Sequence, residues 1–252
     1  MRPNLTGTME PLPAFDLFGV TVTAIDDLTA AEAILTGKIQ GCVHFANTHV
    51  MSESTRDPSL RSALQAGTVL PDGMPLVWAA RRSGLKALRR RAAGPEVMKN
   101  AIDKSEGRQV SHFLLGTNQE TLSLLRTEIL ERWPTASIAG SLAPKYGDFS
   151  DADVLAYANA AKSSGADLVW LGLSSPRQDI LAHRLARHTS QTLLCVGAAF
   201  DFIAGTKATC PALLQRFGLE WLFRLATEPR RLFRRYATTI PRFIRLYLKE
   251  VS

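Results

Sequence analysis

The sequence predicts an α/β fold with a Rossmann-like parallel sheet, followed by a helical, basic C-terminal appendage. Two observations carry this prediction. From Gln109 onwards, short apolar segments alternate with helical ones, and the excess positive charge of the chain lies in residues 207–252. Alternation of strands and helices is typical of βαβ units, which build parallel sheets. We therefore expect an α/β body over residues 1–206 and a helical appendage over residues 207–252.

The first half of the body carries a less regular set of elements. Phe15–Ala24 alternates around Gly19, which predicts a strand or a hairpin. Two short strands are expected, at Cys42–Ala46 and at Val69–Leu70. Helices are expected over Leu28–Lys38 with Asp26 or Asp27 as the cap, over Ser59–Gln65, over Pro75–Arg82 and from Gly94 onwards.

The second half is regular. Four apolar strands, VSHFLLG, ASIAGSL, DLVWLGL and TLLCVGAAF, alternate with helical segments at 118–132, 151–163 and 177–187. Gly116, Gly172 and Gly197 close three of these strands. They lie at the edge where parallel sheets bind ligands, so Gly116 is a candidate site residue.

Composition excludes several classes of protein. With 46% hydrophobic and 21% charged residues, the chain has ample apolar area for a folded core. Cys42, Cys195 and Cys210 show neither a disulfide framework nor metal-binding spacing, which favours a reducing cytosolic setting. The N-terminal stretch lacks the apolar region of a signal peptide, and no apolar run approaches the roughly 18–20 residues of a spanning helix. We expect a soluble or peripheral protein.

The appendage carries the whole formal charge of +7. Residues 1–206 hold twenty Lys and Arg against twenty Asp and Glu, and residues 207–252 hold ten against three. At helical spacing Arg231, Arg235, Arg242, Arg245 and Lys249 share one stripe. The opposite face holds Phe233, Tyr236, Ile240, Phe243, Ile244, Tyr247 and Val251. Two interpretations stay open: a helix on an anionic membrane surface, or a helix docked on the body with a solvated basic face.

Two polar residues follow neighbouring predicted strands of the first half. Asp72 lies in a Pro-Asp-Gly turn, where a carboxylate can serve as a general base or form a structural Asx-turn. Asn47 ends the preceding strand and faces the same edge, as a site residue or as a helix cap.

Other motifs in the sequence give weaker evidence of a functional site. The segment from Ser174 to Asp179 opens a helix, whose free N–H groups can bind phosphate or a sugar hydroxyl, although an ordinary cap explains Ser and Pro as well. Asp151 and Asp153 have a metal-type spacing, but a helix-capping role is favoured. The sequence contains no phosphate-binding P-loop, no nucleophile elbow and no histidine metal spacing.

The block from Gly218 to Arg234 is the most distinctive stretch. Arg224, Arg231 and Arg234 share one side of a helix if Pro229 is accommodated, and guanidinium groups so placed can bind a diphosphate through paired hydrogen bonds. The alternative is membrane-facing or solvated charge.

Taken in order, these segments resemble the WecG/TagA/CpsF glycosyltransferases, bacterial enzymes that extend lipid-linked glycans. The resemblance covers about residues 15–246. Its markers are Asn47, Pro71-Asp72-Gly73, Arg91-Ala-Ala-Gly94, Phe113–Gly116, Leu171–Asp179, Val196–Asp201, Gly218–Arg224 and Glu228–Arg231.

The resemblance implies inverting, metal-independent transfer from a UDP-sugar to a polyprenyl-diphosphate-linked sugar in cell-surface polysaccharide synthesis. By the same resemblance Asp72 matches the general base. No cofactor or metal is implied, and the donor sugar stays open among N-acetylmannosamine, its uronic acid, glucose and others. The substrate-binding residues are then Asn47, Arg91, Gly116, Gln178, Asp201, Arg224, Arg231 and Arg234.

The chain departs from the family pattern at three places. Pro176-Arg-Gln-Asp replaces the usual Pro-Lys-Gln-Glu and keeps the charges. Thr209 replaces an expected arginine, and Phe45 replaces a frequent threonine. With Thr209, one expected cation is missing, and these departures leave the identity of the sugar unassigned.

The resemblance also implies the partners and the location. We expect the appendage to contact an anionic membrane at the cytoplasmic face, as a peripheral protein, and the sequence is compatible with a homo-oligomer. The alternative function is nucleic-acid binding by the basic tail, since phosphate contacts would account for the charge. The aromatic and aliphatic face of the tail suits lipid or protein better than a phosphate groove, so nucleic acid is not an expected partner.

Overall fold

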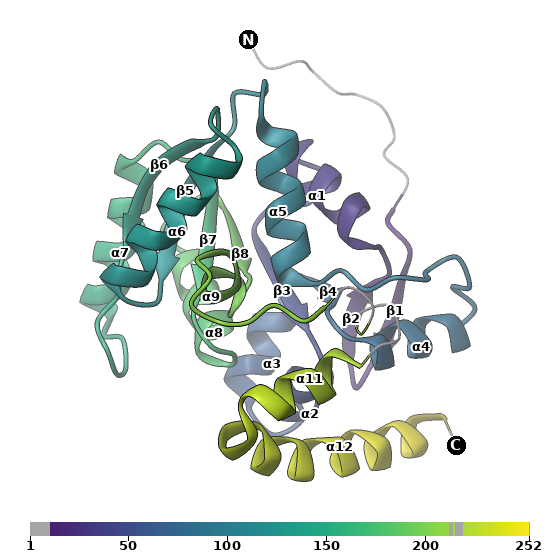
Figure 1. Ribbon diagram of the computed structural model, residues 1–252. Helices are drawn as coiled ribbons and strands as arrows, with labels where there is room; N and C mark the ends of the chain where they lie inside the picture. Colours follow the sequence, from purple (N-terminus) through teal and green to yellow (C-terminus); the bar gives the residue numbers. More distant parts are fainter. Residues whose placement is uncertain (1–10, 212–213, 215–218, 252) are drawn as a thin grey trace.

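The computed structural model describes residues 11–211, 214 and 219–251. Its centre is one eight-stranded sheet with the order β1-β2-β4-β3-β8-β7-β5-β6 (Figure 1). Only β1 runs antiparallel to its neighbour, β2; every other pair in this sheet is parallel. The predicted α/β fold with a parallel sheet is therefore confirmed.

The strands are short and, in the centre of the sheet, buried over their whole length. Such strands are typical of parallel sheets covered on both faces. Their bounds are Ala14–Leu17 (β1), Val20–Thr23 (β2), Cys42–Ala46 (β3), Thr68–Pro71 (β4), Ser111–Gly116 (β5), Ser137–Leu142 (β6), Leu168–Gly172 (β7) and Thr192–Cys195 (β8).

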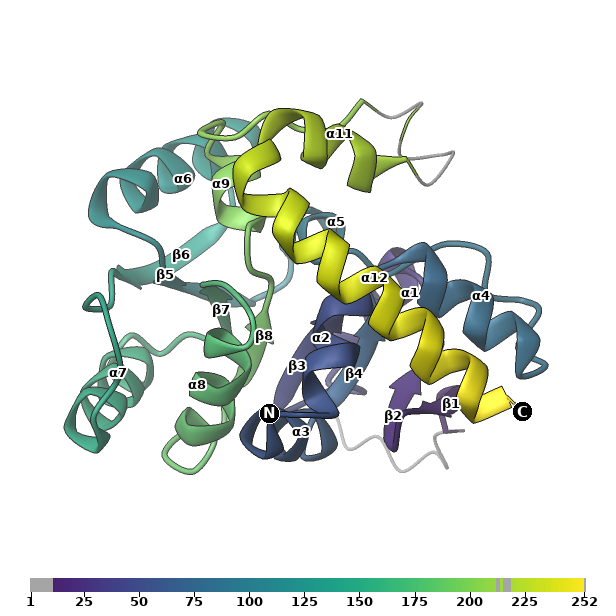
Figure 2. The same cartoon turned by 90° about the horizontal axis from the view of Figure 1, so that it is seen from below.

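Helices cover both faces of the sheet (Figure 2), with α1, α5 and α6 on one face and α3, α7 and α8 on the other. The helices of the body are Asp27–Leu35 (α1), Thr48–Ser54 (α2), Pro58–Gln65 (α3), Met74–Arg82 (α4), Gly94–Ser105 (α5), Gln119–Arg132 (α6), Asp151–Ser163 (α7), Arg177–Leu185 (α8) and Ala199–Ile203 (α9). The appendage contributes α11 (Glu220–Thr227) and α12 (Pro229–Val251).

Most predicted elements are confirmed, with local differences. Phe15–Ala24 forms a hairpin, because Phe18 and Gly19 both adopt positive φ and turn the chain between β1 and β2. The first helix ends at Leu35, before Gly37, whose positive φ of 73° is typical of a helix end. The helix expected over 177–187 ends at Leu185.

The order of the strands creates a switch point in the middle of the sheet. The chain builds β2, β3 and β4 on one side, crosses to β5 and β6, and returns through β7 to place β8 against β3. In open α/β sheets ligands bind outside the carboxyl ends of the strands at such a point. The ends of β3, β4 and β8 therefore mark the candidate site.

The tail differs from its prediction at the junction of its two helices. The chain turns at Glu228, which has non-helical backbone angles, so α11 and α12 are separate helices. The expectation that Arg224 shares one helix side with Arg231 and Arg234 is therefore wrong. Helix α12 itself is continuous and contains Pro241.

Helix α12 lies along α2 and the hairpin (Figure 2). Phe243 is buried in the core cluster of the hairpin and α4, and it contacts the Phe18 ring edge to face at 5.4 Å. Arg242 pairs with Glu53 of α2 at 2.6 Å, and the Glu250 carboxylate accepts from the Phe18 amide at 2.9 Å. The docked-helix interpretation thus holds for one side of α12.

A second apolar stripe of α12 stays exposed. Phe233 is 66% exposed and Leu248 58%, and Ile240 and Ile244 lie between them at helical spacing. The single apolar face of the prediction is therefore two stripes, one docked on the body and one open. Within the described residues, no helix combines the length and apolar character needed to cross a bilayer.

Candidate active site

Two strand ends hold the predicted pair of polar residues. The Asp72 amide donates to the carbonyl oxygen of Ala46 at 2.8 Å, which joins the end of β4 to the end of β3. Asn47 follows Ala46 and caps α2, accepting from the amides of His49 and Val50 at 3.0 and 3.3 Å. The capping interpretation of Asn47 is confirmed, and its position places it next to the turn that carries Asp72.

Asp72 is partly buried and lies at the N-terminus of α5, where the Gly94 amide hydrogen-bonds its carboxylate. Burial raises the pKa of Asp72 to about 7, although Arg91 and Arg224 act to lower it. The Glu220 carboxylate acts in the same direction as burial. A carboxyl group with a pKa near neutrality suits a general base.

Gly94 is the residue that allows α5 to begin so close to the sheet. A Cβ at this position would lie 3.1 Å from the Val196 carbonyl oxygen, just after β8. Any larger residue would push the helix start, and with it the amide that faces Asp72, away from the strand ends.

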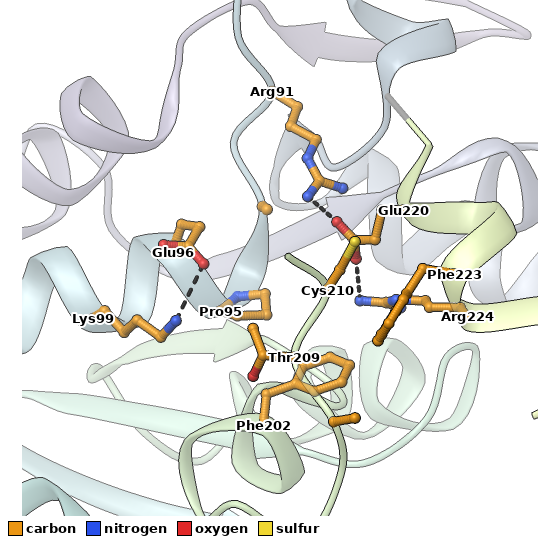
Figure 3. Close-up of a pocket in the computed structure, with 12 residues that line it drawn as sticks. Arg91, Pro95, Glu96, Lys99, Phe202, Thr209, Cys210, Glu220, Phe223 and Arg224 are labelled. Carbon is orange, nitrogen blue, oxygen red and sulfur yellow. Dashed lines mark hydrogen bonds and ion pairs between the residues drawn. The ribbon is translucent and has the colours of Figure 1, made fainter. Parts of the chain in front are cut away.

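A pocket opens between the body and the appendage (Figure 3), and its lining includes Arg91 and Arg224, whose charges act on Asp72. Its wall combines charged groups with the rings of Phe202 and Phe223, a pairing typical of sites that hold a polar ligand with a flat ring. The lining residues are Arg91, Ala93, Pro95, Glu96, Lys99, Phe202, Ala208, Thr209, Cys210, Glu220, Phe223 and Arg224.

Two arginines meet one carboxylate in this pocket (Figure 3). Arg91, from the loop before α5, forms an ion pair with Glu220 of α11. Arg224, one turn further along α11, pairs with the other oxygen of Glu220 at 2.6 Å, and its guanidinium lies 4.9 Å from the centre of the Phe202 ring. Both guanidinium groups are close enough to Asp72 to affect its pKa.

Gln178, in the first turn of α8, is only 3% exposed. Its Nε2 donates to the Cys195 carbonyl oxygen at 2.7 Å, and its Oε1 is buried without a hydrogen-bond partner. Gly197 lies next to it, since a Cβ there would be 3.6 Å from either polar atom of Gln178.

A buried cluster supports this part of the sheet. His44 Nδ1 and Asp179 Oδ1 are 2.8 Å apart, and Cys195 lies beside them, with candidate metal-ligand atoms within 4.8 Å of one another. The three residues come from β3, α8 and β8. Sequence spacing did not indicate this cluster because it forms only when the sheet is assembled. The His44–Asp179 contact fixes the start of α8, where Gln178 lies.

Of the predicted site residues, Arg91 and Arg224 line the pocket, whereas Asp72, Asn47 and Gln178 lie outside its lining. Gly116, Asp201 and Arg234 also lie outside it. Gly116 ends β5 against β7, where a Cβ would be 2.5 Å from the Gly172 carbonyl oxygen, so close strand packing accounts for this glycine. Asp201 of α9 pairs with Lys207 at 2.7 Å. Arg234 is exposed on α12, and the Arg231 side chain, like Gly218, falls outside the described part.

The capping interpretation of the Asp-x-Asp pair is confirmed. Ser150 and Asp153 form a capping box at the start of α7, and Asp151 pairs with Arg184 at 2.8 Å. Lys145 adds a contact to Asp153. Both carboxylates therefore have structural partners far from the pocket.

The site also contains residues that sequence reasoning did not assign. Glu220, Phe202 and Phe223 line the pocket, and so do Glu96 and Lys99 of α5. For Glu220 the sequence does contain a signal. It lies four residues before Arg224 in the most distinctive block of the tail, a spacing that places the two side chains on one helix face. Thr209, one of the departures from the family pattern, also lies in the lining, next to Cys210.

The model of the glycosyl transferase WecG/TagA/CpsF family matches residues 15–252. The chain belongs to this family. It is a glycosyltransferase, and the prediction of an enzyme is confirmed. A curated relative from Bacillus spizizenii is 28% identical over 208 residues, which are 81% of this chain and 77% of the relative. That relative is an N-acetylglucosaminyldiphosphoundecaprenol N-acetyl-beta-D-mannosaminyltransferase.

Proposed function

We propose that this glycosyltransferase moves a sugar from a UDP-sugar to a polyprenyl-diphosphate-linked sugar, with inversion and without a metal ion. The observation that carries the proposal is the convergence of Arg91 and Arg224 on one carboxylate, with the charges of both arginines acting on the partly buried Asp72. Such a site combines a proton acceptor with cations for a leaving diphosphate. The name of the Bacillus relative favours N-acetylmannosamine as the donor sugar and a diphosphoundecaprenol-linked acceptor.

In this proposal Asp72 takes the proton of the acceptor hydroxyl. The hydroxyl oxygen attacks the anomeric carbon, the bond from that carbon to the UDP oxygen breaks, and the electron pair leaves with UDP. The pKa of about 7 allows the Asp72 carboxylate to accept the proton near neutrality. Attack from the face opposite UDP inverts the anomeric centre.

The departing UDP needs positive charge, which we assign to Arg91 and Arg224. Two guanidinium groups can bind a diphosphate through paired hydrogen bonds and stabilise the charge that develops in the transition state. Arg231 and Arg234 are proposed to join them when α12 closes on the substrate. Asn47, Gln178, Gly116 and Asp201 are proposed to shape the rest of the substrate site, through the strand ends and the start of α8.

The same proposal places the enzyme at the membrane as a peripheral protein on the cytoplasmic face. The support is the open stripe of Phe233, Ile240, Ile244 and Leu248, with the exposed Arg245 and Lys249 beside it on α12. Apolar side chains flanked by cations are typical of helices on anionic lipid surfaces. A lipid-linked acceptor would then reach the pocket from the membrane.

The decisive experiment measures UDP release from a panel of UDP-sugars, using a soluble polyprenyl-diphosphate-GlcNAc analogue as acceptor, with and without EDTA. We expect release with UDP-N-acetylmannosamine, unchanged by EDTA, and only in the presence of acceptor. Strict dependence on Mg²⁺ would contradict the metal-free part. No turnover with any sugar nucleotide and this acceptor class would contradict the proposed reaction.

A further inference from the structure

The pocket already contains an anion at the position where the proposed reaction needs a diphosphate. Each oxygen of the Glu220 carboxylate faces a different guanidinium, one from Arg91 and one from Arg224. The Glu220 side chain is only 14% exposed, so the contact is shielded from solvent. A carboxylate shared by two arginines uses the same paired donors that would bind phosphate oxygens.

The two arginines differ in how they are held. Arg224 is four residues from Glu220 on α11 and also stacks over Phe202. Arg91 belongs to the loop before α5, so its contact with Glu220 joins the body to the appendage. The carboxylate therefore brings together two cations from separate parts of the chain, both close enough to Asp72 for their charges to lower its pKa.

We propose that Glu220 is a displaceable counter-anion: its carboxylate holds Arg91 and Arg224 together in the free enzyme, and the donor diphosphate takes its place. The inference rests on the proposed function, because it takes the ligand of these arginines to be a diphosphate. Glu220 thus prepares the anion site and competes with the ligand for it. Donor binding exchanges one anion for another and leaves the body and the appendage bridged by the substrate.

The exchange predicts an unusual result for a residue that lines a binding site. Removing the charge of Glu220 should strengthen the binding of a diphosphate, since the ligand no longer has to displace a bound carboxylate. A residue that only orients the arginines would give the opposite result, because its loss would scatter the two cations and weaken binding.

The test compares Glu220→Gln with wild type in the full-length chain, by calorimetric titration with inorganic pyrophosphate, UDP and uridine. The matched control is Glu53→Gln, which removes the same charge from another ion pair between body and appendage, Glu53–Arg242. Thermal melting verifies that each variant is folded. Glu220→Asp is the second variant, because its shorter side chain keeps the charge but cannot reach both guanidinium groups.

We expect Glu220→Gln to bind pyrophosphate and UDP at least fivefold more tightly, with uridine affinity unchanged. Glu53→Gln should match wild type, and Glu220→Asp should fall between the two. Equal or weaker pyrophosphate binding by a folded Glu220→Gln variant would overturn the inference while leaving the donor site intact. If that variant does not fold, equal or weaker binding by Glu220→Asp overturns it. Failure of wild type to bind UDP or pyrophosphate would instead overturn the proposed donor site, and the inference with it.

Discussion

The Asp72 amide and the Ala46 carbonyl oxygen are joined by a 2.8 Å hydrogen bond that continues the β3–β4 pairing into the site. This bond fixes the backbone of the turn on the central part of the sheet. On its other side, the Gly94 amide at the start of α5 holds the carboxylate itself. Asp72 is therefore placed by two rigid elements, which is what a general base requires.

The first prediction concerns this carboxylate. Asp72→Asn should lower the turnover of the transfer reaction by about 10²–10⁴-fold, the usual contribution of a positioned base. The amide has nearly the same shape, so the fold and UDP binding should persist. Initial rates and UDP titration of the same preparation test both parts. Turnover equal to wild type would exclude Asp72 as the base.

The second prediction concerns pH. Because burial raises the pKa of Asp72 to about 7, the carboxyl group of the folded enzyme is largely protonated below that pH. The rate constant kcat/KM should therefore rise from about pH 6 to about pH 8 and then level off, as the base becomes ionised. Initial rates at low donor concentration across this range measure the rise of kcat/KM with pH.

The same shift has a consequence for stability. A carboxyl group with a raised pKa binds its proton more tightly in the folded state, so its contribution to stability is lost as pH rises from about 4 to about 7. Asp72→Asn should then melt at a higher temperature than wild type above pH 7, and the difference should shrink in acid. A constant difference across this window would contradict the raised pKa.

The body could be predicted from sequence because its signals are local. Apolar strands such as Leu168–Gly172 are short, and helix starts such as Asn118 and Ser150 carry their own caps. Asp72 and Asn47 could be placed at one edge for the same reason, since both directly follow strands. Parallel pairing then brought them together without any further information.

The rest of the site depends on contacts between distant segments. Glu220 faces Arg91 only because the appendage lies against the body, and the ion pair links positions 129 residues apart. Helical spacing also placed Phe243 with Phe233 on one face of α12. The structure separates them, because Phe243 packs on the hairpin while Phe233 stays exposed. Periodicity finds an apolar face but does not say what covers each part of it.

The basic stripe of α12 likewise contains residues that contact the body and residues that are exposed. Arg242 pairs with Glu53, and Arg235 is half-buried and close enough to His49 to lower the pKa of that histidine. Among the cations of this stripe whose side chains the structure describes, Arg245 and Lys249 are the exposed ones. For Arg235 and Arg242 the structure therefore supports the docked-helix interpretation, since both interact with residues of α2.

The third prediction concerns the docking of α12. His49 of α2 contacts the Thr239 hydroxyl at 3.2 Å, and burial, together with Arg235 and Arg242, lowers the pKa of His49 to about 4, with Glu53 opposing. Protonation in acid is then favoured only when the contact opens. Stability from this contact should be complete above about pH 6.5 and fall as pH drops towards 4.

Melting temperatures of wild type and His49→Gln between pH 4 and 7 isolate this effect. The glutamine amide can still hydrogen-bond Thr239 but does not titrate, so the variant should lose less stability in acid. The buried His112, whose pKa is also lowered to about 4, contributes equally to both proteins and cancels in the comparison. Identical pH profiles would show that His49 is not the group involved.

The fourth prediction concerns the open stripe of α12. Phe233 and Ile244 are 66% and 51% exposed in the appendage. Each would gain up to about 1.5–3 kcal/mol by entering a lipid interface. Replacing both by serine should weaken binding to vesicles containing anionic lipid by at least about tenfold, since every 1.4 kcal/mol corresponds to a factor of ten.

The matched control for this measurement lies on the body. Leu124 of α6 and Leu155 of α7 are 44% and 46% exposed, on helices that pack against β6, whereas α12 packs against α2. Their replacement by serine removes comparable apolar surface without touching the appendage, so vesicle binding should match wild type. Sedimentation of each variant with vesicles of phosphatidylglycerol and phosphatidylcholine gives the comparison. Equal loss in both double variants would mean that binding follows total surface hydrophobicity, and equal retention would mean that α12 does not contact the membrane.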